Sequence, residues 1–458
     1  MSFIHQLRAT PELPGPELIG AKAHGLFTMM RLGLPVPPGF VISTEACRVF
    51  LRDGLLPDGL ISELTAALSA LERLYPAQPQ LQPRPGRPAA TGGPLSVSVR
   101  SGAAVSMPGM MDTLLNVGDR ANRADNQIHS AVEDVFRSWN TPRAVTYREL
   151  QDIPHDLGTA VIVQTMVFGD RDSHSGSGVA FSRDPSTGEK GAYGDVLFGH
   201  QGDDVVSGQV PTRPLTDLAE WQPLVWAELL QTLDLLERHF RDVCHVEFTV
   251  ESGQLWLLQV RAGGLSGRAT VRATVDLADE GLIDRRTALT RVTPRHLRAA
   301  RIPRLNLETG NEVVARGVGA SPGVATGRIA VTSDQAARMA AAGPVILFRP
   351  YTSPLDMHGL AAAAGIVTTV GGPTSHAAVV ARSLGKPSVV SATALSIDTV
   401  NGCVHAPGGV LLEGTVITID GLGGEVVLGS PEATDDETDP HLARLLSWAD
   451  QAITEGTT

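Results

Sequence analysis

The stretch "GGPTSHAAVVARSLGKP" (371–387) decides how the C-terminal half of the sequence is interpreted. Thr374 or Ser375 can cap a helix and Gly385 can end it, so the pattern predicts a short helix with His376 in its first turn. Backbone N–H groups and the helix dipole favour an anion at that end. Imidazole, with an ordinary pKa of about 6.5, is mostly neutral and nucleophilic at about pH 7.5. His376 is therefore either a phosphoryl-accepting nucleophile or a structural histidine.

Short apolar segments around this helix indicate a small β/α domain. Strands are predicted at "GPVILFRP", "AGIVTTV" and "PSVVSA", and the helix lies between the last two. We expect this domain to span 313–430. Arginine-rich helical sequence (263–312) precedes it as a linker, and an acidic tail with one amphipathic helix (431–458) follows it. Residues 1–262 then form a separate N-terminal domain, so the sequence predicts a multidomain α/β protein.

The segment "HVEFTVESGQLWLLQVR" (245–261) has the pattern of a hairpin, with two alternating strands around a turn. Glu247, Gln259 and Arg261 have odd numbers on the paired strands, so they can project from one face. A carboxylate and an amide oxygen suit Mg²⁺, and a neighbouring guanidinium can hold phosphate oxygens. An ordinary half-exposed hairpin explains the same alternation, and the spacing alone does not separate the two interpretations.

Two cationic residues near the N-terminus carry weaker signals. Arg100 ends a predicted strand and precedes a loop with Gly102 and Gly109, an arrangement that is common in phosphate-binding loops. Lys22 lies on a predicted helix, where a surface lysine is the default interpretation. Between them, the segment 75–94 is rich in proline and glycine, which predicts an exposed loop.

Composition limits the class of protein. The chain has 458 residues, of which 42% are hydrophobic and 19% charged, and its formal net charge is −12. This length suits about three domains, and an acidic chain is a poor general binder of nucleic acid or anionic membranes. The three cysteines are far apart, which argues against a disulfide framework or a zinc site. With no signal-peptide core and no apolar run near about 20 residues, a soluble cytoplasmic protein is expected.

Six segments together resemble the pyruvate phosphate dikinase family and, more loosely, its relative phosphoenolpyruvate synthase. In chain order they are "RLGLPVPPGF", "SVRSGAAVSMPGMMDT", "FRSWNTPRAVTYR", "TGEKGAYGD", "QGDDVVSG" and "GGPTSHAAVVARSLGKP". The loop "SMPGMMDT" favours the dikinase. The resemblance implies an ATP-grasp nucleotide-binding domain followed by a swivelling β/α phosphohistidine domain.

The resemblance also implies roles for individual residues. His376 matches the phosphorylated histidine, with Thr374, Ser375 and Arg382 in support, and Arg100 and Arg261 are catalytic with it. Glu247 and Gln259 are the implied ligands of Mg²⁺, for which Mn²⁺ is the alternative. The implied nucleotide-binding residues are Lys22, Arg100, Gly109, Met111, Glu247, Gln259 and Arg261.

The implied reaction consumes ATP and phosphate. The histidine takes the β,γ-pyrophosphoryl group of ATP, AMP leaves, inorganic phosphate removes pyrophosphate, and a phosphohistidine remains. The family's large C-terminal barrel for pyruvate and phosphoenolpyruvate is not expected after "LLSWADQ". We therefore expect the phosphoryl group to pass to an acceptor held by another chain, such as a separate barrel protein.

Two substitutions depart from the family pattern and keep other interpretations open. His245 stands where the family has an aspartate, and Ala104 stands where it has an arginine. Imidazole suits Mn²⁺ better than Mg²⁺, so His245 is expected to weaken the Mg²⁺ requirement. The alternatives to an autophosphorylating enzyme are a non-catalytic nucleotide-binding regulatory module and a kinase for an unidentified small acceptor.

Overall fold

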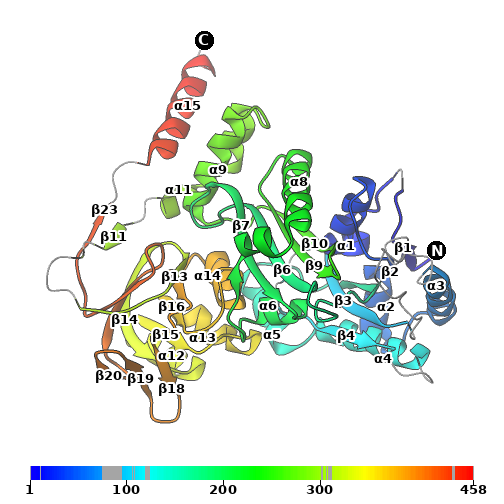
Figure 1. Cartoon of the computed structure of the whole chain (residues 1–458), viewed down its shortest axis with the longest axis horizontal. Coiled ribbons are helices and arrows are strands. Elements are labelled where there is room, and N and C mark those ends of the chain that lie inside the picture. The colour runs from blue at the N-terminus through cyan, green and yellow to red at the C-terminus, as the bar shows by residue number, and fades with distance from the viewer. Residues whose placement is uncertain are drawn as a thin grey trace. The chain divides into compact units, whose positions relative to one another are not determined.

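A computed structural model describes residues 2–10, 12–74, 95–105, 107, 109–118, 124–300, 303–305, 307, 312–435 and 439–456. The loop predicted at 75–94 lies outside the described residues. The chain forms two compact units, Met1–Ser175 with Phe248–Val260, and Gly176–Glu247 with Arg261–Thr458. Most of their elements are labelled in Figure 1. The boundaries expected from sequence, at 262, 312 and 430, stay predictions.

The first unit is built on an antiparallel sheet with the strand order β1-β2-β5-β3-β4. Its strands are β1 (Ile4–Gln6), β2 (Gly39–Ile42), β3 (Val97–Ala103), β4 (Thr113–Val117) and β5 (Thr159–Thr165). Its helices are α1 (Pro16–Arg31), α2 (Thr44–Asp53), α3 (Leu60–Leu74), α4 (Ala124–Ser138) and α5 (Pro142–Leu150).

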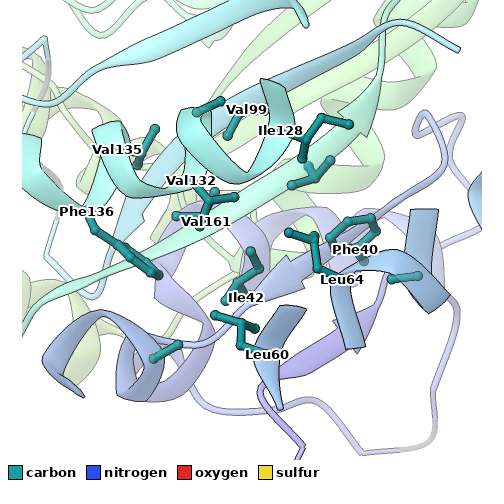
Figure 2. Close-up of a cluster of buried hydrophobic side chains, with 14 of the residues drawn as sticks. Phe40, Ile42, Leu60, Leu64, Val99, Ile128, Val132, Val135, Phe136 and Val161 are labelled. Atoms are coloured by element: carbon teal, nitrogen blue, oxygen red, sulfur yellow. The ribbon is translucent and has the colours of Figure 1, made fainter. Parts of the chain in front are cut away.

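Alternating strand residues and one face of α4 form the core of the first unit, which Figure 2 shows in close-up. Val97 and Val99 alternate along β3, whereas Ile128, Val132 and Phe136 recur at four-residue spacing on α4. These two periods place each set on one face of its element. Full burial of each large side chain contributes about 1.5–3 kcal/mol, so this cluster fixes β3 and the residues at its end.

A close backbone contact holds α1 against β3. Gly20, inside α1, has φ 77°, and a Cβ on it would lie 1.7 Å from the carbonyl oxygen of Gly102. Only glycine combines this φ with this approach. A Cβ on Gly102 would in turn lie 3.6 Å from the Cβ of Lys22. The contact therefore places Lys22 beside the strand that carries Arg100.

The second unit begins with strands of a sheet whose order is β10-β9-β6-β7-β8. These strands are β6 (Gly176–Arg183), β7 (Lys190–Phe198), β8 (Arg213–Pro214), β9 (Cys244–Glu251) and β10 (Gln254–Ala262), the last two of which run from one unit into the other. The accompanying helices are α6 (Gly202–Ser207), η3 (Leu215–Asp217), α7 (Leu218–Trp221) and α8 (Pro223–Phe240). The predicted hairpin at 245–261 is confirmed by β9 and β10.

The predicted linker and tail share one hydrophobic cluster. The linker folds as α9 (Gly267–Asp279), α10 (Arg285–Arg291), α11 (Pro294–Ala300) and β11 (Pro303–Leu305), and β23 (Ala433–Asp435) and α15 (Pro440–Gly456) form the tail. Leu442, Leu445 and Trp448 of α15 are buried against Val271 and Val275 of α9. The amphipathic helix expected at the C-terminus is therefore a packed element of this unit.

An eight-stranded mixed sheet forms the rest of the second unit, in the order β12-β22-β21-β14-β15-β16-β17-β13. Its strands are β12 (Val313–Arg316), β13 (Val318–Ser321), β14 (Val324–Ala330), β15 (Val345–Arg349), β16 (Gly365–Thr368), β17 (Ser388–Val390), β21 (Val416–Asp420) and β22 (Glu425–Leu428). The helical elements are α12 (Ser333–Ala340), η4 (Pro354–Asp356), α13 (Met357–Ala362) and α14 (His376–Leu384), and a small sheet adds β18 (Ser396–Asp398), β19 (Cys403–Ala406) and β20 (Gly409–Leu412).

Strands β14 to β17 are parallel neighbours, and α14 connects β16 to β17. The three strands and the helix expected from sequence are confirmed here. Parallel pairing requires such a crossover, and it brings the carboxyl ends of β15 and β16 to the same edge. Among the helices with described residues, none has both the length and the apolar character needed to span a bilayer.

Candidate functional site

His376 lies at the edge of the mixed sheet, where ligands bind in many parallel α/β folds. It is the first residue of α14 and follows the carboxyl end of β16. Thr352 follows the carboxyl end of the parallel neighbour β15. Because the two strands end side by side, the Thr352 hydroxyl lies 3.0 Å from Nδ1 of His376. The prediction that His376 occupies the first helical turn is confirmed.

The other ring nitrogen of His376 has the properties of a nucleophile. Its Nε2 is buried and has no hydrogen-bond partner among the described residues. Burial lowers the pKa of His376 to about 4, although the negative charge of Asp356 acts in the opposite direction. The imidazole is therefore neutral at pH 7. Its Nδ1 is hydrogen-bonded to Thr352, whereas the position in front of Nε2 is not taken by any described hydrogen-bond partner. A phosphoryl group on Nε2 would lie at the positive end of α14.

A double-glycine turn in front of α14 packs directly on Asp195 of β7. A Cβ on Gly372 would lie 2.3 Å from the Oδ1 atom of Asp195. The Thr374 N–H donates to Asp195 Oδ2 over 3.0 Å and the Thr374 hydroxyl donates to the same oxygen, while the Thr212 hydroxyl donates to Oδ1 over 2.9 Å. Asp195 is 4% exposed, and burial raises its pKa. This carboxylate therefore fixes the loop that leads to His376.

The N-terminal cap of α14 is formed by one of the two expected residues, but without a side-chain hydrogen bond. Ser375 occupies the N-cap position, but its side chain makes no capping hydrogen bond, and the Thr374 hydroxyl bonds Asp195 instead. The prediction that Thr374 or Ser375 caps the helix is therefore confirmed for the position of Ser375, although no side-chain hydrogen bond closes the cap. The C-terminal end is as expected, since Gly385 has φ 67° in the left-handed region.

Arg382 supports the same loop from the far end of α14. Its Nη1 donates to the carbonyl oxygens of Pro373 and Ala320, both over 2.9 Å. Its guanidinium also lies 5.9 Å from the centre of the Phe181 ring. Burial lowers the pKa of Arg382 to about 10, so the group remains charged at pH 7. It binds the backbone just before the helix and thereby holds its first turn in place.

His245 stacks on the same Phe181 ring. Its imidazole is nearly parallel to that ring, and the two ring centroids are 4.5 Å apart. Burial, then the positive charge of Arg261, lowers the pKa of His245 to about 3, against the raising effect of Glu247. His245 is therefore neutral at pH 7. Its electrostatic partners show that Glu247, Arg261 and Arg382 all lie close to it.

A second carboxylate near Glu247 was not singled out from the sequence. Asp203 lies in the first turn of α6, and its pKa is raised by burial, then by the neighbouring charges of Asp204 and Glu247. The negative charges of the two carboxylates repel each other, so binding of a cation near both of them is favoured. The segment "QGDDVVSG" contained the signal, since two adjacent acids follow a glycine there.

The remaining expected nucleotide-binding residues lie in the first unit. Arg100 is 7% exposed, and its Nη1 donates to the carbonyl of Leu258 over 3.2 Å. Gln259 is 1% exposed, and neither atom of its amide has a hydrogen-bond partner among the described residues. Such a group is costly to bury, so its presence points to a ligand that satisfies it. Gly109 has φ 71°, and the neighbouring Met111 is half-buried.

Two family models match the chain. That of pyruvate phosphate dikinase, AMP/ATP-binding domain, matches residues 16–84 and 85–222, and that of the PEP-utilising enzyme, mobile domain, matches residues 341–424. The first range includes Lys22 and Arg100, and the second includes His376. Glu247, Gln259 and Arg261 lie between the matched ranges.

Curated relatives are similar over nearly the whole chain. A pyruvate, phosphate dikinase of Rhizobium meliloti (strain 1021) is 36% identical over 94% of this chain and 58% of its own length. A pyruvate, phosphate dikinase 2 of Oryza sativa subsp. japonica is 36% identical over 95% of this chain and 58% of its own. A pyruvate, phosphate dikinase of Clostridium symbiosum is 35% identical, with corresponding shares of 95% and 59%. The chain thus spans a little under three-fifths of the length of these relatives.

Proposed function

Because the chain belongs to the pyruvate phosphate dikinase family, we propose that it is a phosphotransferase that uses ATP to phosphorylate its own His376. The observation that carries the proposal is the state of the His376 ring. Nδ1 is held by Thr352, whereas Nε2 is buried at the start of a helix with no partner among the described residues. A histidine that only packs or caps has no need of this asymmetry.

The proposed first step begins at Nε2. With Nδ1–H donating to the Thr352 hydroxyl, the lone pair of the neutral ring lies on Nε2 and attacks the β-phosphorus of ATP. The bond to the α,β-bridging oxygen breaks, and AMP leaves with that oxygen. Inorganic phosphate then attacks the outer phosphorus, pyrophosphate leaves, and a phosphohistidine remains. The N-terminal turn of α14 stabilises the negative charge of the phosphoryl oxygens that become attached to Nε2.

Positive groups for the nucleotide come from several elements. We assign phosphate binding to Lys22, Arg100 and Arg261, with the loop of Gly109 and Met111 closing over the phosphates. Arg382 holds the backbone before His376 instead of the nucleotide, as its two carbonyl contacts support. Arg100 and Arg261 have the further role of stabilising charge on the transferring group, because guanidinium groups bind phosphate oxygens in two-point contacts.

The acidic and amide side chains fit a hard divalent cation. Glu247 and Asp203 offer two carboxylates whose negative charges repel each other. Gln259 offers a buried amide oxygen with no hydrogen-bond partner among the described residues. Oxygen ligands of this kind suit Mg²⁺, and we assign Glu247 and Gln259 as its ligands, with Mn²⁺ as the alternative. A bound Mg²⁺ supplies neutralisation of phosphate charge.

The names of the relatives suggest the other substrates. They are pyruvate, phosphate dikinases, so we propose inorganic phosphate as co-substrate and pyruvate as the acceptor of the phosphoryl group. We further propose that the acceptor is presented by a separate pyruvate- and phosphoenolpyruvate-binding barrel protein, to which the domain that carries His376 delivers the group by swivelling. The name of the second matching family model, a mobile domain, supports that delivery.

Phosphoenzyme formation tests the proposal. The chain is incubated with ATP labelled in the β-phosphate, Mg²⁺ and phosphate, and both AMP and acid-labile protein-bound phosphate are measured. We expect one label per chain in the wild type and none in His376→Asn. His358→Asn serves as the matched control, because His358 is an exposed histidine on the nearby helix α13 that pairs with Asp334 at 2.9 Å.

The same experiment separates the alternatives. A regulatory module that binds nucleotide without chemistry gives ATP binding but neither AMP nor label. A kinase that transfers directly to a small acceptor gives no phosphoenzyme with ATP and phosphate alone. Labelling of the His376→Asn protein at the wild-type rate would overturn the assignment of the nucleophile.

A further inference from the structure

Three side chains with different metal-binding atoms meet on the small sheet of β18, β19 and β20, away from His376 in the chain. They are Asp398 at the end of β18, and Cys403 and His405 on β19. One ligand atom from each lies within 4.8 Å of the others, and the Cys403 sulfur is 3.8 Å from Nε2 of His405. Among the described residues, this is the one such group of three histidine, cysteine or acidic side chains.

The strand register explains why they converge. Asp398 is directly opposite Cys403 in the antiparallel pair, so both side chains project from the same face. His405 is two residues beyond Cys403 and therefore shares that face. The alternate residues Val404 and Ile397 point the other way, into the core of the mixed sheet. The three groups are thus held on the outer face by a sheet whose inner face is packed.

The distances suit a metal ion with small side-chain movements. Tetrahedral Zn²⁺ places a sulfur, a nitrogen and an oxygen ligand roughly 3.4–3.6 Å apart at its usual bond lengths. The sulfur–nitrogen separation of 3.8 Å is close to this value. Cys403 is 6% exposed and His405 is exposed, so the group has one covered side and one side open to solvent.

The Asp398 carboxylate is oriented by its own turn. It accepts hydrogen bonds from the backbone N–H groups of Val400 and Asn401 over 3.0 and 2.9 Å, and from the Asn401 side chain over 2.7 Å. Carboxylates that bind metals are commonly fixed by such partners. Both backbone N–H groups donate to Oδ1, whereas Oδ2 accepts only from the Asn401 side chain, so Oδ2 has a second lone pair for a metal. Without a metal, the same contacts are those of an ordinary hairpin turn.

We propose that Asp398, Cys403 and His405 bind one Zn²⁺ or a similar thiol-binding divalent ion, with the fourth position open to water or a ligand. Thiolate, imidazole and carboxylate together favour zinc over Mg²⁺. Binding forms the metal–sulfur bond and releases the Cys403 thiol proton to solvent. The site is independent of the proposed phosphotransfer. The wide spacing of the cysteines in sequence concealed it, because only one of them contributes.

Cobalt titration of the full chain tests the site. After chelator treatment and dialysis under reducing conditions, Co²⁺ is added and the near-ultraviolet thiolate-to-cobalt absorption is followed. We expect saturation at one Co²⁺ per chain, loss of the band on addition of one equivalent of Zn²⁺, and no effect of excess Mg²⁺. Cys403→Ser should abolish the band, and His405→Ala should weaken Co²⁺ binding by roughly a hundredfold or more.

Two other cysteines provide matched controls. Cys47 and Cys244 are buried, and burial raises both pKa values, that of Cys47 to about 12, so neither thiol readily becomes a thiolate ligand. Cys47→Ser and Cys244→Ser should each keep the band.

Thermal unfolding gives a readout that does not depend on cobalt. Micromolar Zn²⁺ should raise the melting temperature of the wild type and of the control variants, but not that of His405→Ala, whose exposed side chain can be removed without loss of packing. Absence of the absorption band in the wild type, or an unchanged band in Cys403→Ser, would overturn the proposal.

Discussion

The hydroxyl of Thr352 provides a direct test of how His376 is prepared for reaction. Thr352 is 2% exposed, and the distance between its Oγ1 and Nδ1 of His376 is 3.0 Å. Thr352→Val keeps the branched shape of the side chain and removes only the hydroxyl. The variant protein should therefore fold normally, while Nδ1 loses its partner in a buried environment.

The expected size of the effect follows from the cost of that lost contact. A neutral hydrogen bond contributes about 0.5–1.5 kcal/mol net, and a buried group left without a partner costs about 1–3 kcal/mol. If the bond holds the ring in the tautomer whose lone pair is on Nε2, a loss of about 1.5–3 kcal/mol appears in the barrier. Phosphoenzyme formation should then slow by roughly 10- to 100-fold.

A rapid-quench measurement of a single turnover gives the rate, and phosphorus NMR of the denatured phosphoprotein identifies the phosphorylated nitrogen. The wild type should carry phosphate on Nε2, and Thr352→Val should form it slowly or with a share on Nδ1. Thr352→Ser restores the hydroxyl and should recover most of the rate. Thr326→Val is the matched control, because the Thr326 hydroxyl lies 2.8 Å from that of Thr418 in the same sheet.

The reasoning is refuted if Thr352→Val forms Nε2-phosphohistidine at the wild-type rate. It is equally refuted if Thr326→Val, which leaves the His376 contact intact, slows the reaction as much as Thr352→Val does.

Three further predictions concern neighbouring groups. Asp195→Ala removes the acceptor of both Thr374 donors and should lower the free energy of unfolding by about 2–4 kcal/mol and slow labelling of His376; an unchanged denaturation midpoint argues against this role. The folded pKa of His376 is about 4, below its ordinary value of 6.5, so the unfolded chain binds a proton first as the pH falls. The free energy of unfolding should therefore decrease by up to about 3 kcal/mol between about pH 6.5 and 4. Denaturant titrations of His376→Asn should lack this part of the decrease. His245→Asp restores a carboxylate beside Glu247 and should lower the Mg²⁺ concentration needed for labelling; superimposable Mg²⁺ and Mn²⁺ curves for the two proteins contradict it.

Local pattern predicted the elements around His376 well, because each has a strong signal of its own. The apolar strands β15, β16 and β17 are short runs of buried residues, and Gly385 ends α14 as the sequence indicates. The end of strand β16 and the end of helix α14 at Gly385 together predict that His376 lies in the first turn of the helix. These features depend on neighbours within a few residues, which a pattern can represent.

Contacts between distant segments could not be read in the same way. Thr352 and Asp195 lie 24 and 181 positions before His376 in the numbering, and the first meets the ring only because β15 and β16 are parallel neighbours. The hydrogen bond of the Thr374 hydroxyl could not be predicted for the same reason, since its acceptor, Asp195, lies on β7. The group on β18 and β19 likewise depends on a register that no single strand reveals.

The contact between Gly372 and Asp195 has a consequence for how sequences of this family can diverge. Any side chain at 372 would displace the carboxylate that Thr374 and Thr212 share, because its Cβ would come within 2.6 Å of both Asp195 oxygens and of the Thr212 hydroxyl. The four positions 195, 212, 372 and 374 therefore depend on one another. A substitution at one of them would disrupt the contacts that the other three residues make. Across homologues we expect them to be inherited as a set, and an alignment in which they vary independently would show that the loop can be held in another way.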